Sequence, residues 1–361
     1  MLRTLARLTT TAVFTILSLC AADVVVNKIT TIKDPGGRVD WSWPRNLIAY
    51  DSAGSNAHYD VYTMRPDGTD ARCLTCNNPQ LPATHKGNPS WHPSGNWIVF
   101  QVQKVNRAMR PQMQKMMDMR GSPGIGVNND LWVMDATGAK LSLLHEVALR
   151  SGALHPEFSP SGKYLLWGEL IELGGGNGLG REELKVAEFH ADGGTPRLDD
   201  IQTFRPGNKT FYESHGWSPD DRKIYFTASP DRGGDDYFMD VFSYDLQSQQ
   251  LVNLTDSPED WDELPTPSPD GSKILWMSTK GNPAPGRGRR TIADFWIMNA
   301  DGSGKKRLTF FNAPGHPESS ATPLSCADAA WSEDGKSIVA LLNRNPMQYD
   351  SAIVRIDLVV R

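Results

Sequence analysis

Two histidines in matching sequence contexts are the residues best suited to chemistry. His155 lies in the segment Leu-His-Pro-Glu-Phe, and His215 follows Glu213 just before Trp217. Comparable places in related segments of the chain carry Asn88, Glu263 and Asp328. Imidazole and carboxylate groups that converge can act as acid and base or hold a divalent metal ion. We therefore take His155, His215 and Glu213 as catalytic candidates; the alternative is that each histidine satisfies a buried carbonyl or faces water.

Basic residues gather in two insertions of the sequence. The insertion from Gln101 to Asn129 has five basic residues against Asp118, and the insertion from Lys280 to Ala293 has four, although the whole chain has a formal net charge of -5. Such local charge favours an anionic ligand, a uronate-bearing glycan or an acidic partner surface; the alternative is a set of solvated loops. The predicted ligand-binding residues are Arg107, Arg110, Arg287, Arg289, Arg290, Asn88 and Asp328. The same charge balance does not favour nucleic acid.

The first insertion is also rich in methionine. Met109, Met113, Met116 and Met117 fall on one side of a helix, with Met119 close by. This spacing is typical of an amphipathic helix that packs on a rim or caps a channel. Thioethers also bind Cu(I), which is the alternative.

The first 22 residues have the pattern of a secretory signal. Arg3 and Arg7 precede an apolar stretch that ends in small residues before Asp23. That stretch is too short for a membrane span, and Leu19 disfavours a lipoprotein anchored through Cys20. We predict a secreted or periplasmic protein with a mature domain of residues 23–361.

Export determines how the remaining cysteines are interpreted. An oxidising compartment favours a disulfide between Cys73 and Cys76, which leaves Cys326 free. A zinc site that recruits His85 and Cys326 is the alternative.

Internal repeats indicate the elements that position these residues. Six copies of a segment rich in Trp, Ser, Pro, Asp and Gly each precede a β-rich run, as in Trp217-Ser-Pro-Asp followed by Ile224-Tyr-Phe. A second segment, such as Asp130-Leu-Trp-Val-Met, follows each copy, and short Leu-Thr strands close most units. Each unit therefore predicts four strands. Six such units predict an all-β, six-bladed propeller of antiparallel blades.

The repeats resemble the WD40-like repeats of the TolB family over residues 38–361. The resemblance implies a single propeller domain, without the α/β domain that precedes the propeller in that family. The β-rich run from Asp23 to Ile32 is expected to supply the outer strand of the last blade, because open sheet edges would otherwise remain. All three large insertions, the third being Glu169 to Glu182, are expected on one face, which we take as functional.

Two further resemblances bear on activity. The His-containing units are similar to parts of oligogalacturonate lyases, metal-dependent propeller enzymes, although the chain lacks their His-rich cluster. The repeats also resemble the propeller of prolyl oligopeptidase-type peptidases, but no Gly-x-Ser-x-Gly segment occurs. The sequence thus predicts a monomeric propeller that binds a ligand or partner on its loop-rich face. The alternative is a lyase that acts on an acidic glycan at the channel mouth, with no cofactor required by the sequence.

Overall fold

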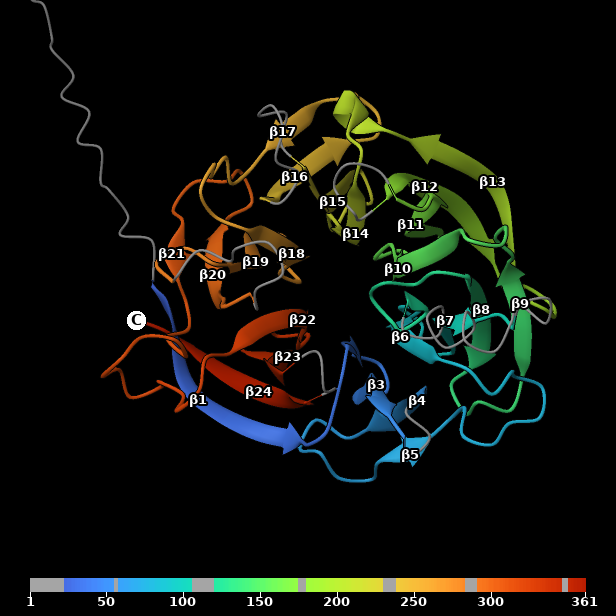
Figure 1. Ribbon diagram of the computed structural model, residues 1–361, viewed down its shortest axis with the longest axis horizontal. Coiled ribbons are helices and arrows are strands. Elements are labelled where there is room, and N and C mark those ends of the chain that lie inside the picture. Colours follow the sequence, from blue (N-terminus) through green and yellow to red (C-terminus); the bar gives the residue numbers. More distant parts are fainter. Residues whose placement is uncertain are drawn as a thin grey trace, which may run out of the picture.

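A computed structural model describes residues 23–54, 58–105, 120–174, 180–229, 238–282, 291–345 and 350–361. Six four-stranded antiparallel sheets are arranged as blades around one axis, which confirms the predicted propeller (Figure 1). No helix of the described residues is long and apolar enough to cross a membrane. The predicted signal segment, residues 1–22, and the methionines of the first insertion lie outside the described residues.

The strands follow one another around the ring in chain order. Blade 1 comprises β2 (Val39–Ser42), β3 (Leu47–Ala53), β4 (Tyr59–Met64) and β5 (Arg72–Cys73); blade 2 comprises β6 (Lys86–Trp91), β7 (Trp97–Gln103), β8 (Asn129–Asp135) and β9 (Leu141–His145). Blade 3 comprises β10 (Gly152–Phe158), β11 (Tyr164–Glu172), β12 (Arg181–His190) and β13 (Arg197–Phe204), and the short 3-10 helix η1 (Pro206–Asn208) leads to the next blade. Blade 4 comprises β14 (Tyr212–Trp217), β15 (Lys223–Ala228), β16 (Asp240–Asp245) and β17 (Leu251–Asn253); blade 5 comprises β18 (Asp262–Pro267), β19 (Lys273–Ser278), β20 (Asp294–Asn299) and β21 (Lys306–Arg307).

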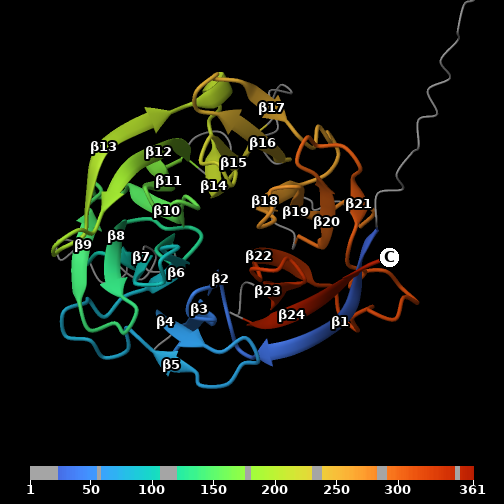
Figure 2. The ribbon, with the colours of Figure 1, turned by 180° about the vertical axis from the view of Figure 1, so that it is seen from behind.

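The last blade joins the two ends of the chain. It comprises β22 (Ser325–Trp331), β23 (Ser337–Asn345), β24 (Asp350–Val360) and β1 (Val24–Lys33). The outer strand β1 pairs antiparallel with β24, from Val24 opposite Val360 to Lys33 opposite Ile353 (Figures 1 and 2). This confirms that the N-terminal strand closes the ring, because β1 covers the edge of β24 that would otherwise be open.

The Trp-Ser-Pro-Asp segments form tight turns between the first and second strands of a blade. In blade 4, Ser218 Oγ donates to Asp220 and accepts the Lys223 amide at 2.8 Å. Blade 6 repeats the arrangement, with Ser332 Oγ accepting the Ser337 amide at 2.9 Å. These side chains fix the turn by bonding the local backbone, which explains why the segment recurs. We call the end of the propeller that carries these turns the turn face.

The Asp and Leu-Thr segments hold the third and fourth strands together. Thr75 Oγ1 donates to Asp60 Oδ1 at 2.7 Å and accepts the amide of Val61 at 2.9 Å. Blades 4 and 5 repeat this arrangement with Asp240 and Thr255, and with Asp294 and Thr309. A fourth strand closes each of these blades as predicted, but it ends before the Leu-Thr pair, and the threonine caps the neighbouring strand with its side chain.

Apolar side chains fill the space between neighbouring blades. One cluster joins Tyr225 and Val241 of blade 4 to Ile274 and Trp276 of blade 5. Near the axis, Trp331 Nε1 donates to the carbonyl of Thr266 in the preceding blade at 3.1 Å. Neighbouring blades are therefore joined by hydrogen bonds as well as by apolar packing.

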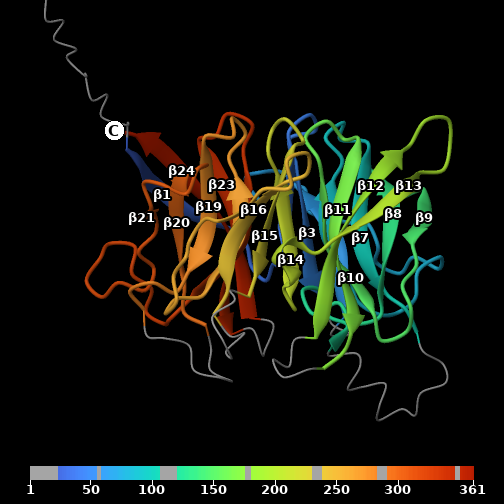
Figure 3. The ribbon, with the colours of Figure 1, turned by 90° about the horizontal axis from the view of Figure 1, so that it is seen from above.

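Seen from the side, the strands run between two faces of the propeller (Figure 3). The face opposite the turns carries the connections between second and third strands and between blades, and we call it the loop face.

Candidate functional site

The innermost strands of the blades bring one residue each toward the axis at the same level. Each inner strand has one residue that pairs with the start of the second strand, at Ile48, Ile98, Leu165, Ile224, Ile274 or Ile338. The residues three positions before it are, in blade order, Arg38, Asn88, His155, Ser214, Leu264 and Asp328. Sequence spacing places His215 and Glu263 in this set, and that alignment is wrong. Glu263 matches Glu213, one residue earlier, and Ser214 matches His155.

Bulges in the inner strands explain the misalignment. The ladder between β10 and β11 skips from Leu154 to Glu157, and that between β14 and β15 skips from Ser214 to Gly216. His155 itself has φ of 46° and Asn88 has φ of 51°. A bulge re-aims side chains beside it, and bulges are frequent next to binding sites. Sequence spacing alone does not reveal how many residues a bulge absorbs.

A cavity of about 530 Å³ opens on the loop face above this level. Its polar lining includes Arg38, Arg120, His155, Glu182, Glu213, Glu263 and Asp328, and its apolar lining includes Phe211 and Trp261. This volume suits a small ligand. We call it the loop-face pocket.

Glu213 lines the pocket and contacts several other titratable side chains. Its Oε1 lies 2.6 Å from Nε2 of His155, and its Oε2 lies 3.9 Å from Nε2 of His215. Glu213 also shares a side-chain hydrogen bond with Glu263, which in turn accepts the indole N–H of Trp261 at 3.0 Å. Two carboxyl groups that share a hydrogen bond hold a proton between them. The structure thus brings His155 and Glu213 together, as the sequence analysis expected, and adds Glu263.

The pKa values in this cluster are displaced by burial. Burial raises the pKa of Glu213 to about 7, and burial with the charge of Glu213 raises the pKa of Glu263 well above its usual range. Burial lowers the pKa of His155 to about 4. At neutral pH His155 is therefore uncharged, and the carboxyl pair retains a proton that it can exchange with a ligand.

Asn88 fixes the tautomer of His155. Its side-chain nitrogen lies 3.0 Å from Nδ1 of the imidazole, and an amide nitrogen can only donate. The neutral ring consequently carries its hydrogen on Nε2, which faces Glu213. Asn88, expected as a ligand-binding residue, positions His155.

A second polar network holds Arg38 beside the pocket, and the sequence analysis missed it. Nε of Arg38 lies 3.7 Å from Oδ2 of Asp328. Asp51 accepts the backbone amides of Arg38 and Asn88 at 2.9 and 2.8 Å. Burial opposes the charge of Arg38, but Asp328 and Asp51 outweigh it and raise its pKa. Asp328 thus lines the pocket as the counter-ion of Arg38, and its role in ligand binding stays a prediction.

Glycine makes room for this network. A Cβ at Gly37 would overlap Oδ1 of Asp51 and lie 2.7 Å from its backbone oxygen, and a Cβ at Gly87 would lie 2.6 Å from Oδ2. The two glycines flank Arg38 and Asn88, the residues whose amides Asp51 accepts. Asp51 lies on a second strand, β3, so only the fold reveals its role.

His215 faces the other end of the axis. The rings of His155 and His215 are 5.6 Å apart, but His215 lines a separate cavity on the turn face. Burial, followed by the charge of His155, places the pKa of His215 well below its usual range. His215 therefore contacts Glu213 from the turn-face side and does not line the loop-face pocket. The predicted arginines Arg107, Arg110, Arg287, Arg289 and Arg290 lie outside the described residues.

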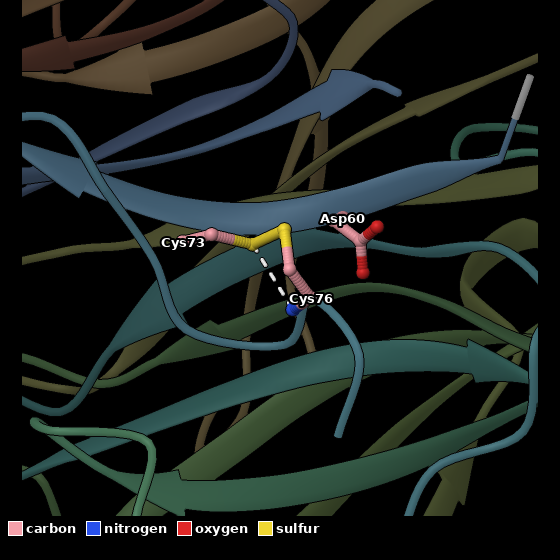
Figure 4. A group of neighbouring side chains, drawn as sticks. All are labelled: Asp60, Cys73 and Cys76. Atoms are coloured by element: carbon pink, nitrogen blue, oxygen red, sulfur yellow. Dashed lines mark hydrogen bonds between the residues drawn. A yellow bond between two sulfur atoms is a disulfide. The ribbon is translucent and has the colours of Figure 1, made fainter. Parts of the chain in front are cut away.

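Cys73 and Cys76 are joined by a disulfide, the pairing that the sequence analysis expects (Figure 4). With Asp60 they form the group of described residues whose spacing suits a metal ion. Their sulfurs bind each other, and Asp60 pairs with Lys86 at 3.1 Å, so this group does not fit a zinc ion as arranged. Cys326 is a free, buried cysteine in another blade.

Comparisons with known proteins place the fold. No model of a protein family matches the sequence, and no curated protein matches it. Among solved structures, TolB from Acinetobacter baumannii has a TM-score of 0.50 at 18% identity, over 76% of this chain and 54% of that one. The chain thus spans about half the length of that TolB protein.

Two oligogalacturonate lyases match over more of their length. One in complex with manganese has a TM-score of 0.50 at 11% identity, over 94% of this chain and 96% of that one. The enzyme from Vibrio parahaemolyticus has a TM-score of 0.50 at 10% identity, over 93% and 98% of the two chains. At these identities the likeness concerns the fold. The chain is a six-bladed β-propeller with a TolB-like fold.

Proposed function

We propose that the protein binds a hydroxyl-rich ligand, a sugar unit of a glycan, in the loop-face pocket. The observation that carries this proposal is the position of Glu213 between His155 and Glu263 in a cavity of about 530 Å³. Sugar hydroxyls donate and accept hydrogen bonds, so they match a set of groups that includes a carboxylate, a protonated carboxyl and a neutral imidazole. Trp261 and Phe211 add aromatic surface.

An acidic sugar would extend toward the basic part of the loop face. Arg38 is already paired with Asp328, whereas Arg120 is exposed and lines the pocket. Arg120 belongs to the same insertion as Arg107 and Arg110. The proposal therefore extends to uronate-bearing glycans, bound by an exported protein whose residues 1–22 are its signal peptide.

Calorimetry with neutral and uronate oligosaccharides tests binding. Glu213→Gln should weaken affinity by roughly tenfold, because it removes the charged acceptor beside His155. Glu172→Gln, at an exposed position of β11, is the matched control and should bind as wild type. Equal affinity of Glu213→Gln and wild type for every glycan that binds would refute the placement of the ligand in this pocket.

Charge reversal separates uronate recognition from sugar binding. Replacing Arg287, Arg289 and Arg290 by Glu should weaken binding of the uronate glycan, and the loss should shrink with rising salt because exposed charges are screened beyond about 10 Å at 0.1 M. Neutral glycans should be unaffected. If the affinity for the uronate glycan is unchanged by both the charge reversal and the salt concentration, these arginines do not take part in binding.

A lyase acting on an acidic glycan is the second candidate. The favouring observation is the raised pKa of Glu213, about 7, which suits a group that takes and returns a proton near neutral pH. In an elimination, one group of the Glu213–Glu263 pair would remove the proton next to the sugar carboxylate while its partner protonates the departing oxygen. Glu213→Gln should then abolish formation of the unsaturated product while substrate still binds. Absence of that product with wild-type protein leaves the binding function alone.

A further inference from the structure

A second cavity, of about 260 Å³, lies at the turn face, at the other end of the axis from the loop-face pocket. Its wall is aromatic and rich in proline, with indoles contributed by Trp41, Trp43, Trp91, Trp217 and Trp331. We call it the turn-face pocket. Trp43 is 42% exposed, at the surface of the molecule. The indoles are held in place: Trp43 Nε1 donates to the carbonyl of Trp331 at 2.8 Å, and Trp217 Nε1 donates to that of Glu157 at 3.0 Å.

The charged groups of this pocket are acidic. Asp40 of β2 and Glu157 of β10 line it, and its described lining contains neither lysine nor arginine. His92 and His215 also line it, and burial lowers the pKa of each, so that both are neutral near pH 7. The pocket therefore lacks a compensating positive charge among the residues that the structure describes.

Glu157 and His215 have unused polar atoms. Both oxygens of Asp40 accept backbone amides, from Trp41 at 2.7 Å and Trp91 at 2.6 Å. In contrast, the Glu157 carboxyl has neither a hydrogen bond nor an ion pair within the described part of the chain; its pKa is raised by burial and by the charges of Asp40 and Asp328. Nε2 of His215 is buried without a hydrogen-bond partner among the described residues, on a side chain that is 6% exposed. A ligand that satisfies these atoms would relieve their burial cost.

We propose that the turn-face pocket binds a small organic cation, an alkylated ammonium group, which pairs with the Glu157 carboxylate inside the tryptophan wall. Aromatic rings attract cations through their electron-rich faces, and cages of this kind recognise alkylated ammonium ions. A hydroxyl on the same ligand can donate to the free nitrogen of His215. The site is distinct from the loop-face pocket and does not depend on the function proposed there.

The lining favours an organic cation over a metal ion. Calcium takes six to eight oxygen ligands, whereas here the Asp40 oxygens are occupied by backbone amides, and five tryptophans and six prolines line the wall. An alkylated ammonium is weakly hydrated and loses little on entering such a wall. A volume of about 260 Å³ admits a molecule of the size of choline.

Binding should depend on pH through Glu157. A cation stabilises the ionised carboxylate, so affinity should rise with pH as Glu157 loses its proton. The other groups that act on it are Asp40 from β2 and Asp328 from β22, with the neutral His215 from β14 lining the same pocket. Both acids oppose the ionisation of Glu157, so the affinity should change at a pH above the usual pKa of glutamate.

Calorimetry and tryptophan fluorescence with tetramethylammonium and choline test the proposal on the full mature chain. Wild type should bind one cation with an affinity that rises from pH 5 to pH 8, and Glu157→Gln should weaken it by roughly tenfold or more. Glu172→Gln, at an exposed position that lines neither pocket, is the matched control and should leave cation binding unchanged. Calcium should not compete.

Three results would overturn this assignment: no binding by wild type at millimolar cation, equal binding by Glu157→Gln, or the same loss of binding in Glu172→Gln. If Glu157→Gln does not fold, chemical-shift mapping of the indole N–H groups in wild type shows where the cation binds. Shifts confined to tryptophans of the turn-face pocket support the site, and shifts elsewhere or none contradict it. Glycan binding at the loop-face pocket can fail without affecting any of these outcomes.

Discussion

Nε2 of His155 lies 2.6 Å from Oε1 of Glu213, yet the two groups do not form an ion pair at mildly acidic pH. The pKa of His155 is about 4 and that of Glu213 is about 7, so between these values both are predominantly neutral. The contact is therefore one between a neutral imidazole and a protonated carboxyl. Only above the pKa of Glu213 does the carboxyl become an anion, and it then faces a donor that Asn88 has already oriented.

The raised pKa of Glu213 predicts a pH dependence of stability. A carboxyl whose pKa is raised by folding favours the folded state most below its unfolded pKa, about 4.3, and this contribution is lost as pH rises through the folded value of about 7. Relative to Glu213→Gln, wild type should lose on the order of 2 kcal/mol of unfolding free energy between pH 4.5 and 8. Urea unfolding at both pH values measures the difference.

His155 acts in the opposite direction, because its lowered pKa favours folding above about pH 6.5 and that contribution is lost as pH falls through about 4. The comparison with Glu213→Gln cancels this contribution, since both proteins contain His155. Glu172→Gln should reproduce the wild-type profile. Parallel profiles of wild type and Glu213→Gln would contradict the raised pKa.

Removing β1 should destabilise the whole ring. Val24, Val26 and Ile29 pack against the core of the last blade, and the deletion exposes the edge of β24 along its length. Partial burial of three such side chains contributes a few kcal/mol, so we expect the melting temperature to fall by about 10 °C. Lys28→Ala, at an exposed position of the same strand, is the control. Calorimetry that finds the truncated protein melting within a degree or two of the mature chain would exclude β1 as the closing strand.

Gly37→Ala should damage the Arg38 network. The new methyl group would collide with the side chain and backbone of Asp51, and we expect a loss of roughly 2 to 4 kcal/mol in unfolding free energy. Gly194→Ala is the matched control, because a Cβ there meets no atom of the described residues within 4 Å and its backbone is not left-handed. Chemical denaturation of both variants checks this. Similar stability of the two would mean that Asp51 can move away without cost.

The disulfide should contribute modestly to stability. It closes a loop across a sequence separation of only three, for which chain entropy accounts for about 2 kcal/mol at most. The double substitution of Cys73 and Cys76 by Ser should therefore lower the unfolding free energy by 1 to 2 kcal/mol, roughly, without loss of the fold. Thiol labelling of the chain from Asp23 onward should find no reactive thiol when native and one, Cys326, when unfolded without reductant. Three labelled thiols would show that the disulfide does not form in the protein.

The fold could be predicted because its information is local and repeated. Each turn is fixed by side chains such as Ser218 and Asp220 that bond within six residues, so each copy of the segment identifies its own hairpin. The closing role of β1 followed from counting strands and finding one missing. His155 and Glu213 were found because imidazole and carboxylate groups precede recognisable aromatic residues.

The remainder of the site depends on distances that the sequence does not encode. Asp51 accepts the amides of Arg38 and Asn88 from a second strand, and Glu182 lines the pocket from the start of β12. The bulges beside Asn88, His155 and His215 shift which residues share a level, so spacing misassigned His215 to the pocket of His155. The signal that could have pointed to Asp51 is the pair Gly37 and Gly87, each next to an axial residue.

The pairing of β1 with β24 also imposes an order on folding. Val24 cannot meet Val360 until the last blade has been synthesised, so the ring remains open while the other blades are being made. During that interval the segment Val-Val-Val-Asn-Lys-Ile is an unpaired strand able to associate with other chains. Lys28 introduces charge into it, and Lys33 does so at the end of the same strand, which disfavours such association. The contact that completes the molecule is thus among its most distant in sequence, and we expect ring closure to be the slow step of its folding.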